Sequence, residues 1–258
     1  MDLPRVMANR RTRGAAGGFP TTRHSALLGL RSADPEIRAR NLARIARLYW
    51  RPIYKHVRLR WSKSPDEAEE ITQEFLLRAV GAGIFRAYEA ERGHFRTFLR
   101  ALVDHFAIDR ARSAFTRKRG QGTITVPLDI QTLEGELRSD ASPEWDPAEF
   151  FEREWIRSLV AISIESLRAV CQEKGKAEHF RVFERWYSER HDESSYAAIA
   201  ADLDLSVTTV MNRLHYARKE FRAVVLAVLR EFTTNEQELR AEARAVLGIE
   251  RYRPDGVP

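Results

Sequence analysis

Side chains that can donate hydrogen bonds gather in one short stretch of the second half of the chain. Between Ser206 and Lys219 they recur at helical spacing, while Val207, Val210 and Leu214 fall on the inward side. An α-helix fits the major groove of B-DNA, where such groups reach base edges and phosphates. The sequence therefore predicts a DNA-reading helix whose contacts come from Ser206, Thr208, Thr209, Asn212, Arg213, His215, Tyr216 and Lys219.

A first helix and a tight turn are needed to present that surface, and the preceding residues predict both. Ser195 suits the cap of a helix in which small alanines permit a close helix crossing. Asp204 tolerates left-handed backbone geometry, and Ser206 suits the cap of the second helix. A generic helical hairpin with a charged exterior is the alternative. Caps, turn and exposed face agree instead on a helix-turn-helix unit.

An acidic helix is predicted in the first half of the chain. Ser64-Pro65-Asp66-Glu67 is a capping box with proline in its first turn, and it marks a helix start. Ala68, Ile71, Phe75 and Ala79 then form a buried stripe at helical spacing. The rest of the circumference is acidic with one apolar position, and it comprises Asp66, Glu69, Glu70, Gln73, Glu74 and Leu77.

A third helix combines aromatic residues with a cluster of cations. Phe95, Phe98, Leu102 and Phe106 lie on one helical stripe, which favours a core position over a base-stacking role. Positive charge is concentrated after them, and a basic groove of this kind attracts the phosphates of nucleic acid. The cations expected to contact DNA are Arg96, Arg110, Arg112, Arg117 and Lys118.

Composition agrees with a polyanionic partner. Lys and Arg number 43 against 37 Asp and Glu in 258 residues, a formal charge of +6. The single cysteine, Cys171, excludes an internal disulfide and a thiolate zinc cluster, and it suits a reducing compartment. No apolar run approaches the length of a membrane span, so we expect a cytoplasmic protein without one.

Hydrophobic residues at helical spacing run through both halves, and no strand-rich segment competes with them. Asp34-Pro35 marks the start of a first helix, and a second helical stretch carries Tyr49 to Val57. The sequence predicts an all-α fold with two helical domains joined by a flexible linker. The parts are a basic arm over 1–18, a first domain over 19–119, a Gly- and Ser-containing linker over 120–147, a helix-turn-helix domain over 148–230 and an extension over 231–258 with a short helix from Asn235 to Leu247.

Three segments resemble one known family. Tyr196-Ala-Ala-Ile-Ala, Leu205-Ser-Val and Thr209-Val-Met-Asn-Arg-Leu-His-Tyr-Ala-Arg resemble the promoter-reading helix-turn-helix of bacterial sigma-70 factors. The Asp66-Glu-Ala-Glu-Glu-Ile-Thr-Gln-Glu-Phe segment is similar to the acidic helix by which these factors bind RNA polymerase. The segment from Gly93 to Asp109 is similar to their helix that melts and reads the minus-ten element. The order of these segments matches the family, and the resemblance is to its extracytoplasmic-function type.

The resemblance implies a transcription initiation factor that catalyses nothing itself and needs no cofactor or metal. Its partners would be promoter DNA and core RNA polymerase, through the clamp of the largest subunit and the flap of the second-largest. An anti-sigma factor or a kinase could regulate it. The acidic helix would bind polymerase, the donors from Ser206 to Lys219 would read the minus-35 element, and His105 and Asp109 would join the minus-ten contacts.

The sequence bears on two other classes of function. The chain has no Gly-x-x-x-x-Gly-Lys, His-Glu-x-x-His, Gly-x-Ser-x-Gly or Cys-x-x-Cys motif, and its seven histidines are scattered, which argues against an enzyme or a metal site. An autonomous helix-turn-helix repressor or activator, with an N-terminal sensing or dimerisation domain, stays open. The acidic face from Asp66 to Glu74 favours the sigma interpretation.

Overall fold

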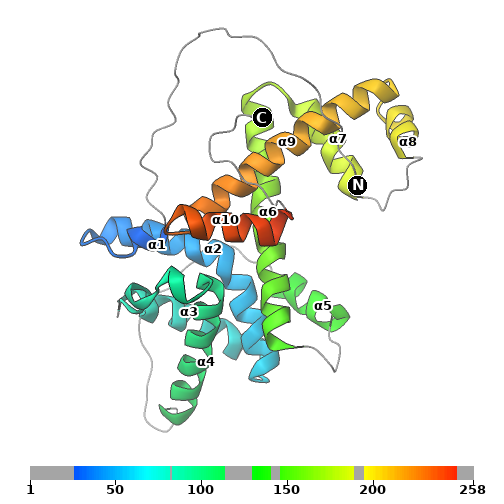
Figure 1. Ribbon diagram of the computed structural model, residues 1–258. Helices are drawn as coiled ribbons and strands as arrows, with labels where there is room; N and C mark the ends of the chain where they lie inside the picture. Colours follow the sequence, from blue (N-terminus) through cyan, green and yellow to red (C-terminus); the bar gives the residue numbers. More distant parts are fainter. Residues whose placement is uncertain (1–25, 82, 114–129, 141–145, 189–194, 249–258) are drawn as a thin grey trace.

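The computed structural model describes residues 26–81, 83–113, 130–140, 146–188 and 195–248 (Figure 1). Within these ranges the chain forms ten α-helices, two short 3-10 helices and no strand. The predicted all-α fold is therefore confirmed. The predicted basic arm, as well as Arg117 and Lys118, lie outside the described residues.

The first half of the chain is built around one long helix. Asp34 caps it by accepting a hydrogen bond from the Glu36 backbone N–H at 2.8 Å, as the Asp34-Pro35 pair predicts. The two helical stretches expected up to Val57 form a single helix that continues through the buried Pro52. The elements are α1 (Ala26–Gly29), α2 (Pro35–Arg60), α3 (Pro65–Gly81), η1 (Ile84–Ala87), η2 (Ala90–Arg92) and α4 (Phe95–Ser113).

Helix α3 begins with the predicted capping box. The Ser64 backbone N–H donates to a Glu67 carboxylate oxygen at 3.1 Å, and the Glu67 backbone N–H donates to Ser64 Oγ at 3.3 Å. Its predicted apolar stripe is buried against α2. The acidic residues are thereby left on the outer side of α3.

A helix occupies the segment predicted to be a linker. Within 120–147, residues Ile130–Asp140 form α5, whose Leu133 and Leu137 are buried in the core with α2. Glu134 accepts hydrogen bonds from Tyr54 Oη at 2.7 Å and Arg58 Nε at 2.6 Å. The prediction of a flexible linker is wrong for 130–140, because the apolar pair four residues apart forms one buried face of a short helix.

The second half contains α6 (Pro147–Glu173), α7 (Ala177–Ser188), α8 (Ser195–Asp202), α9 (Val207–Glu231) and α10 (Glu236–Leu247). The buried side chains of the described residues form two hydrophobic cores, and both long helices α6 and α9 contribute to each of them. The beginning of α6 and the end of α9 pack with α2, whereas the other ends pack with α7 and α8. The division between cores therefore crosses α6 and α9 rather than falling at residue 148 (Figure 1).

A buried ion pair joins α2 to α6. The Lys55 and Glu154 side chains are both fully buried, with Lys55 Nζ 2.9 Å from Glu154 Oε2. Arg51 Nε also donates to Glu154, at 2.8 Å. Burial alone would raise the pKa of Glu154, but the bonds from Lys55 and Arg51 lower it below its ordinary value.

Within the described ranges, no helix combines the length and apolar character needed to cross a bilayer.

Candidate functional site

Helices α8 and α9 form the predicted helix-turn-helix. Asp204 has a left-handed backbone (φ 52°) in the turn, and the Leu205 backbone N–H donates to the Ala200 carbonyl at 2.8 Å. Ser206 then caps α9, since its side chain accepts a hydrogen bond from the Thr209 backbone N–H at 3.1 Å. Turn and cap therefore match the geometry that the residue types predict.

The inner side of α9 fixes which residues face outward. Val210, Leu214 and Ala217 are buried in the core of the second half, as predicted. Val207 is instead 43% exposed, so its predicted inward position is wrong. Val207 is the first residue of α9, and the buried residues of the helix begin with Val210.

A stripe of four donors lies on the outer side of α9. Thr208, Asn212, His215 and Lys219 are exposed and recur at spacings of four, three and four residues. The stripe is about 16 Å long at the rise of an α-helix. Met211 adjoins it and is 51% exposed. The arrangement offers donors and one apolar contact to a surface such as a DNA groove.

The other predicted contacts of this helix are partly engaged inside the protein. Ser206 and Thr209 bond to each other at 2.7 Å. Arg213 is half-buried and lies 3.4 Å from a Glu178 oxygen of α7. Tyr216 packs edge-on against His179, with ring centroids 4.9 Å apart. These four residues hold the unit together in this conformation, so the outward stripe carries most of the available donors.

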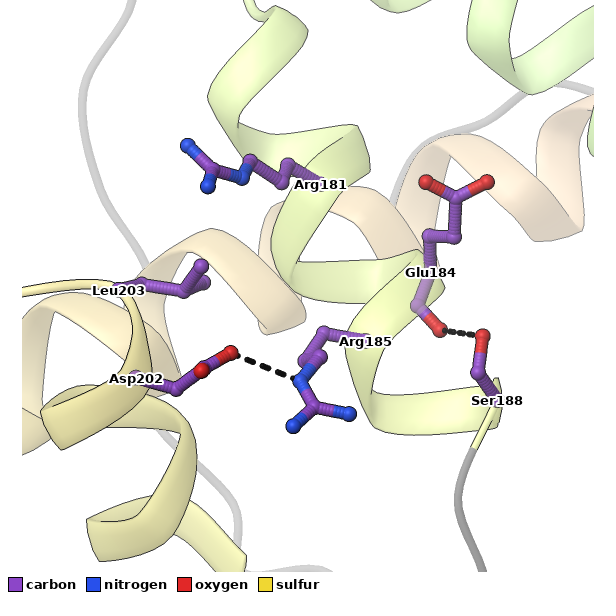
Figure 2. Close-up of a pocket in the computed structure, with 6 residues that line it drawn as sticks. All are labelled: Arg181, Glu184, Arg185, Ser188, Asp202 and Leu203. Atoms are coloured by element: carbon purple, nitrogen blue, oxygen red, sulfur yellow. Dashed lines mark hydrogen bonds and ion pairs between the residues drawn. The ribbon is translucent and has the colours of Figure 1, made fainter.

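A shallow pocket lies between α7 and α8 (Figure 2). Arg185 Nε donates to Asp202 at 2.8 Å, and Glu184 pairs with Arg168 at 2.7 Å. The charged groups of the pocket therefore include cross-links between helices. The Arg185–Asp202 pair holds α8 against α7, and the Arg168–Glu184 pair holds α7 against α6.

The predicted acidic face lies on the outer side of α3. Asp66 and Glu70 are exposed, and Glu69, Glu74 and Leu77 are half-buried. The remaining member, Gln73, is half-buried and donates to the Glu69 carboxylate at 3.2 Å. The structure thus brings the six predicted residues together on one accessible surface.

This acidic face is connected to α4 by an arginine from the second predicted site. Arg110 pairs with Glu70 at 2.8 Å and also with Glu74. Glu74 further pairs with Arg78, at 3.2 Å. The proposed polymerase contacts and one proposed minus-ten contact therefore share ion pairs in the free chain.

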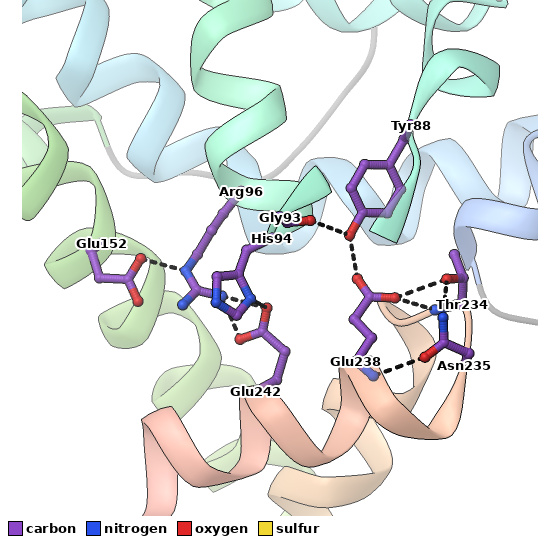
Figure 3. A network of polar contacts seen from close by, with 9 residues as sticks. All are labelled: Tyr88, Gly93, His94, Arg96, Glu152, Thr234, Asn235, Glu238 and Glu242. Carbon is purple, nitrogen blue, oxygen red and sulfur yellow. Dashed lines mark hydrogen bonds and ion pairs between the residues drawn. The ribbon is translucent and has the colours of Figure 1, made fainter. Parts of the chain in front are cut away.

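The other minus-ten candidates on α4 have different surroundings. His105, Asp109 and Arg112 are exposed. Arg96, in contrast, is only 5% exposed and pairs with Glu152 of α6 and Glu242 of α10 (Figure 3). Its guanidinium also lies over the Trp155 ring, 4.4 Å from the centroid. Arg96 is therefore not available to DNA in this conformation, which corrects its prediction as an exposed contact.

Two acidic residues of α10 were not indicated by the sequence patterns. Glu238 and Glu242 are buried, although both belong to a helix whose role the sequence left open. Their spacing of four places them on one face with Leu239 and Ala243. The sequence signal that could have indicated them is the position of two acidic residues on the same helical face as the apolar residues.

No family model, no curated protein and no solved structure matches this chain. Within the described ranges, no three His, Cys, Asp or Glu side chains converge to hold a metal ion. Function is accordingly inferred from the residues and their geometry.

Proposed function

We propose that the chain is a sigma-70-type specificity factor of bacterial RNA polymerase, of the extracytoplasmic-function type. The observation that carries this proposal is the capped helix-turn-helix, whose second helix presents Thr208, Asn212, His215 and Lys219 outward. An outward acidic face on α3 supports polymerase as the partner, because a self-sufficient DNA-binding protein has no need of it. Its members occur in the order and position that the family resemblance implies.

In this proposal the two halves have separate tasks. The α3 face binds the clamp of the polymerase, and α4 contacts the minus-ten region through Arg110 and Arg112. The α9 stripe reads the minus-35 element in duplex form, where Asn212 suits an adenine and Lys219 suits a phosphate. Polymerase performs the phosphoryl chemistry. In this proposal the chain acts in the cytoplasm of a bacterium.

Co-elution with purified bacterial core RNA polymerase tests the proposal. We expect the intact chain to co-elute and the Glu70→Lys/Glu74→Lys variant to lose co-elution, because both carboxylates lie on the binding face. The charge-matched control is Glu91→Lys/Glu173→Lys, which reverses two exposed acids on η2 and α6. Circular dichroism checks that each variant keeps its helices.

Two results would count against this function. Co-elution that survives the Glu70 and Glu74 reversals would remove the acidic face from the binding surface. Absence of co-elution together with tight binding of duplex DNA by a dimer of the chain would favour the autonomous repressor or activator.

DNA reading is tested separately on the holoenzyme with promoters selected from a random pool. Asn212→Ala should change the selected minus-35 sequence and leave co-elution with polymerase intact. Lys219→Ala should weaken binding to all sequences about equally, since a phosphate contact carries no base information. An unchanged selected sequence for Asn212→Ala would contradict the assignment of the stripe.

A further inference from the structure

Helix α10 lies against the beginning of α4, where the proposed minus-ten segment starts (Figure 3). Its apolar residues Leu239 and Ala243 are buried in the core that also contains α2 and the end of α9. Its carboxylates Glu238 and Glu242 are buried as well, at 7% and 5% exposure. A helix with such a face is firmly docked on the first half of the molecule.

Glu242 binds two cationic or donor side chains of the minus-ten segment. Arg96 donates from one terminal nitrogen to both Glu242 oxygens, and His94 Nδ1 lies 2.8 Å from the first of them. An ionised carboxylate only accepts hydrogen bonds, so His94 is the donor. The same geometry on Arg96 and His94 would suit a phosphate, which also offers paired oxygens and negative charge.

Glu238 makes a second connection, one turn earlier on α10. The Tyr88 hydroxyl lies within hydrogen-bond distance of a Glu238 carboxylate oxygen and of the Gly93 carbonyl, at 3.0 Å from the latter, and its single hydrogen is donated to one of these two acceptors at a time. The other Glu238 oxygen accepts from the Thr234 backbone N–H at 2.6 Å and from Thr234 Oγ1 at 2.9 Å. The connection therefore joins the turn before α10 to the residues that precede α4.

We propose that α10 is an autoinhibitory helix whose Glu242 carboxylate occupies a phosphate-binding position on the minus-ten segment. The proposal rests on the proposed function for the meaning of that segment. In the closed chain, Glu242 takes the place of a DNA phosphate on Arg96 and His94. Displacement of α10 uncovers this position and permits DNA to bind.

The surroundings of Arg96 keep it in place when α10 leaves. Its Nε pairs with Glu152, and its guanidinium plane lies over the Trp155 ring; both residues belong to α6. When α10 leaves, the terminal nitrogen of Arg96 that donates to Glu242 loses that partner. Helix α10 has only 12 residues, a length that is marginal for an isolated helix in water, so its order depends on docking.

The test compares Glu242→Gln with Glu236→Gln in the full-length chain. Both variants remove one negative charge from α10, but Glu236 is exposed whereas Glu242 is buried on Arg96. Amide hydrogen exchange reports release of α10, and a fluorescent single-stranded DNA 20-mer reports binding. We expect faster α10 exchange and about tenfold tighter DNA binding for Glu242→Gln, since weakening the closed state raises the competent fraction.

Two more variants make the result decisive. Leu239→Ser removes the apolar anchor and leaves both carboxylates intact, so it should also free α10 and tighten DNA binding. Arg96→Ala in the Glu242→Gln background should abolish the gain. Freed α10 without tighter binding, or a gain equal to that of Glu236→Gln, would overturn autoinhibition. Autoinhibition would also be refuted if neither the Glu242→Gln variant nor the Leu239→Ser variant bound DNA more tightly than the unaltered chain.

Polymerase co-elution is measured on the same variants to separate the two proposals. A Glu242→Gln chain that co-elutes but gains no DNA binding refutes autoinhibition and leaves the sigma assignment standing. A chain that gains DNA binding on release of α10 but never co-elutes refutes the sigma assignment instead.

Discussion

Replacing Glu154 by leucine should destabilise the chain strongly, because it leaves a buried cation with fewer partners. Lys55 is fully buried on α2, and it pairs with Glu154 at 2.9 Å and Glu136 at 2.6 Å. Arg51 also donates to Glu154, at 2.8 Å. In Glu154→Leu, Glu136 of α5 is the carboxylate that still pairs with both Lys55 and Arg51.

The expected cost follows from the burial of these charges. Removing one partner of a buried ion pair costs about 3–5 kcal/mol, and the remaining Glu136 contact places Glu154→Leu near 3 kcal/mol. Lys55→Met should cost only about 1 kcal/mol, because Glu154 keeps Arg51 and Arg157 and the methylenes are replaced by apolar atoms. The Lys55→Met/Glu154→Leu double variant should lose about 1 kcal/mol of stability, since it removes both the Lys55 and the Glu154 charge from the interior.

Guanidinium denaturation followed by circular dichroism measures these differences. Glu154→Leu should also lower Tm by about 6–12 °C, at roughly 2–4 °C per kcal/mol for a chain of this size. The diagnostic result is that Lys55→Met rescues Glu154→Leu. Additive losses in the double variant would refute the close, buried contact between α2 and α6.

Three further predictions concern the turn, the cap and the docked α5 helix. Ser206→Ala should cost about 1 kcal/mol by denaturation, whereas Ser206→Asp, which can still accept from the Thr209 N–H, should cost less. Asp204→Val should cost about 1–2 kcal/mol, because φ is 52° there, and Asp204→Gly should be tolerated; equal losses would contradict the left-handed turn. Arg58 lowers the pKa of Glu134 below its ordinary 4.5, so the unfolded chain takes up this proton first as pH falls. The ionised Glu134 therefore stabilises the fold above pH 4.5, and this stabilisation is lost as the pH falls below 4.5. The dependence of Tm on pH should accordingly be weaker in Glu134→Gln than in the unaltered chain.

Local features of this fold could be predicted from the sequence. The capping box at Ser64, the cap at Ser206 and the left-handed Asp204 depend on residues within four positions of one another. The buried stripe of α3 follows from helical periodicity in the same way. Such signals are readable because their partners are close in the sequence.

Features that depend on distant partners could not be predicted. Arg96 reads as an exposed cation, yet Glu242, 146 positions later, is one of the residues that bury it. Helix α5 reads as a linker because its two leucines are separated by polar residues, and their burial depends on α2. Asp104 of α4 likewise depends on distant partners, since it accepts hydrogen bonds from His56 at 2.8 Å and Trp61 at 3.0 Å. Burial would raise the pKa of Asp104, but these bonds lower it, so an acid is well suited there.

The two cores impose a condition on how the proposed surfaces can work together. Helices α6 and α9 run through both cores, so the α3 face and the α9 stripe cannot move far apart while both helices stay straight and docked. Separation would expose Val225, Leu229 and Phe232, which are buried beside α2. That exposure is unfavourable in water unless another surface covers these residues. If the chain binds two separate promoter elements, as the proposed function requires, a partner must supply the contacts that cover these residues, and RNA polymerase would be that partner.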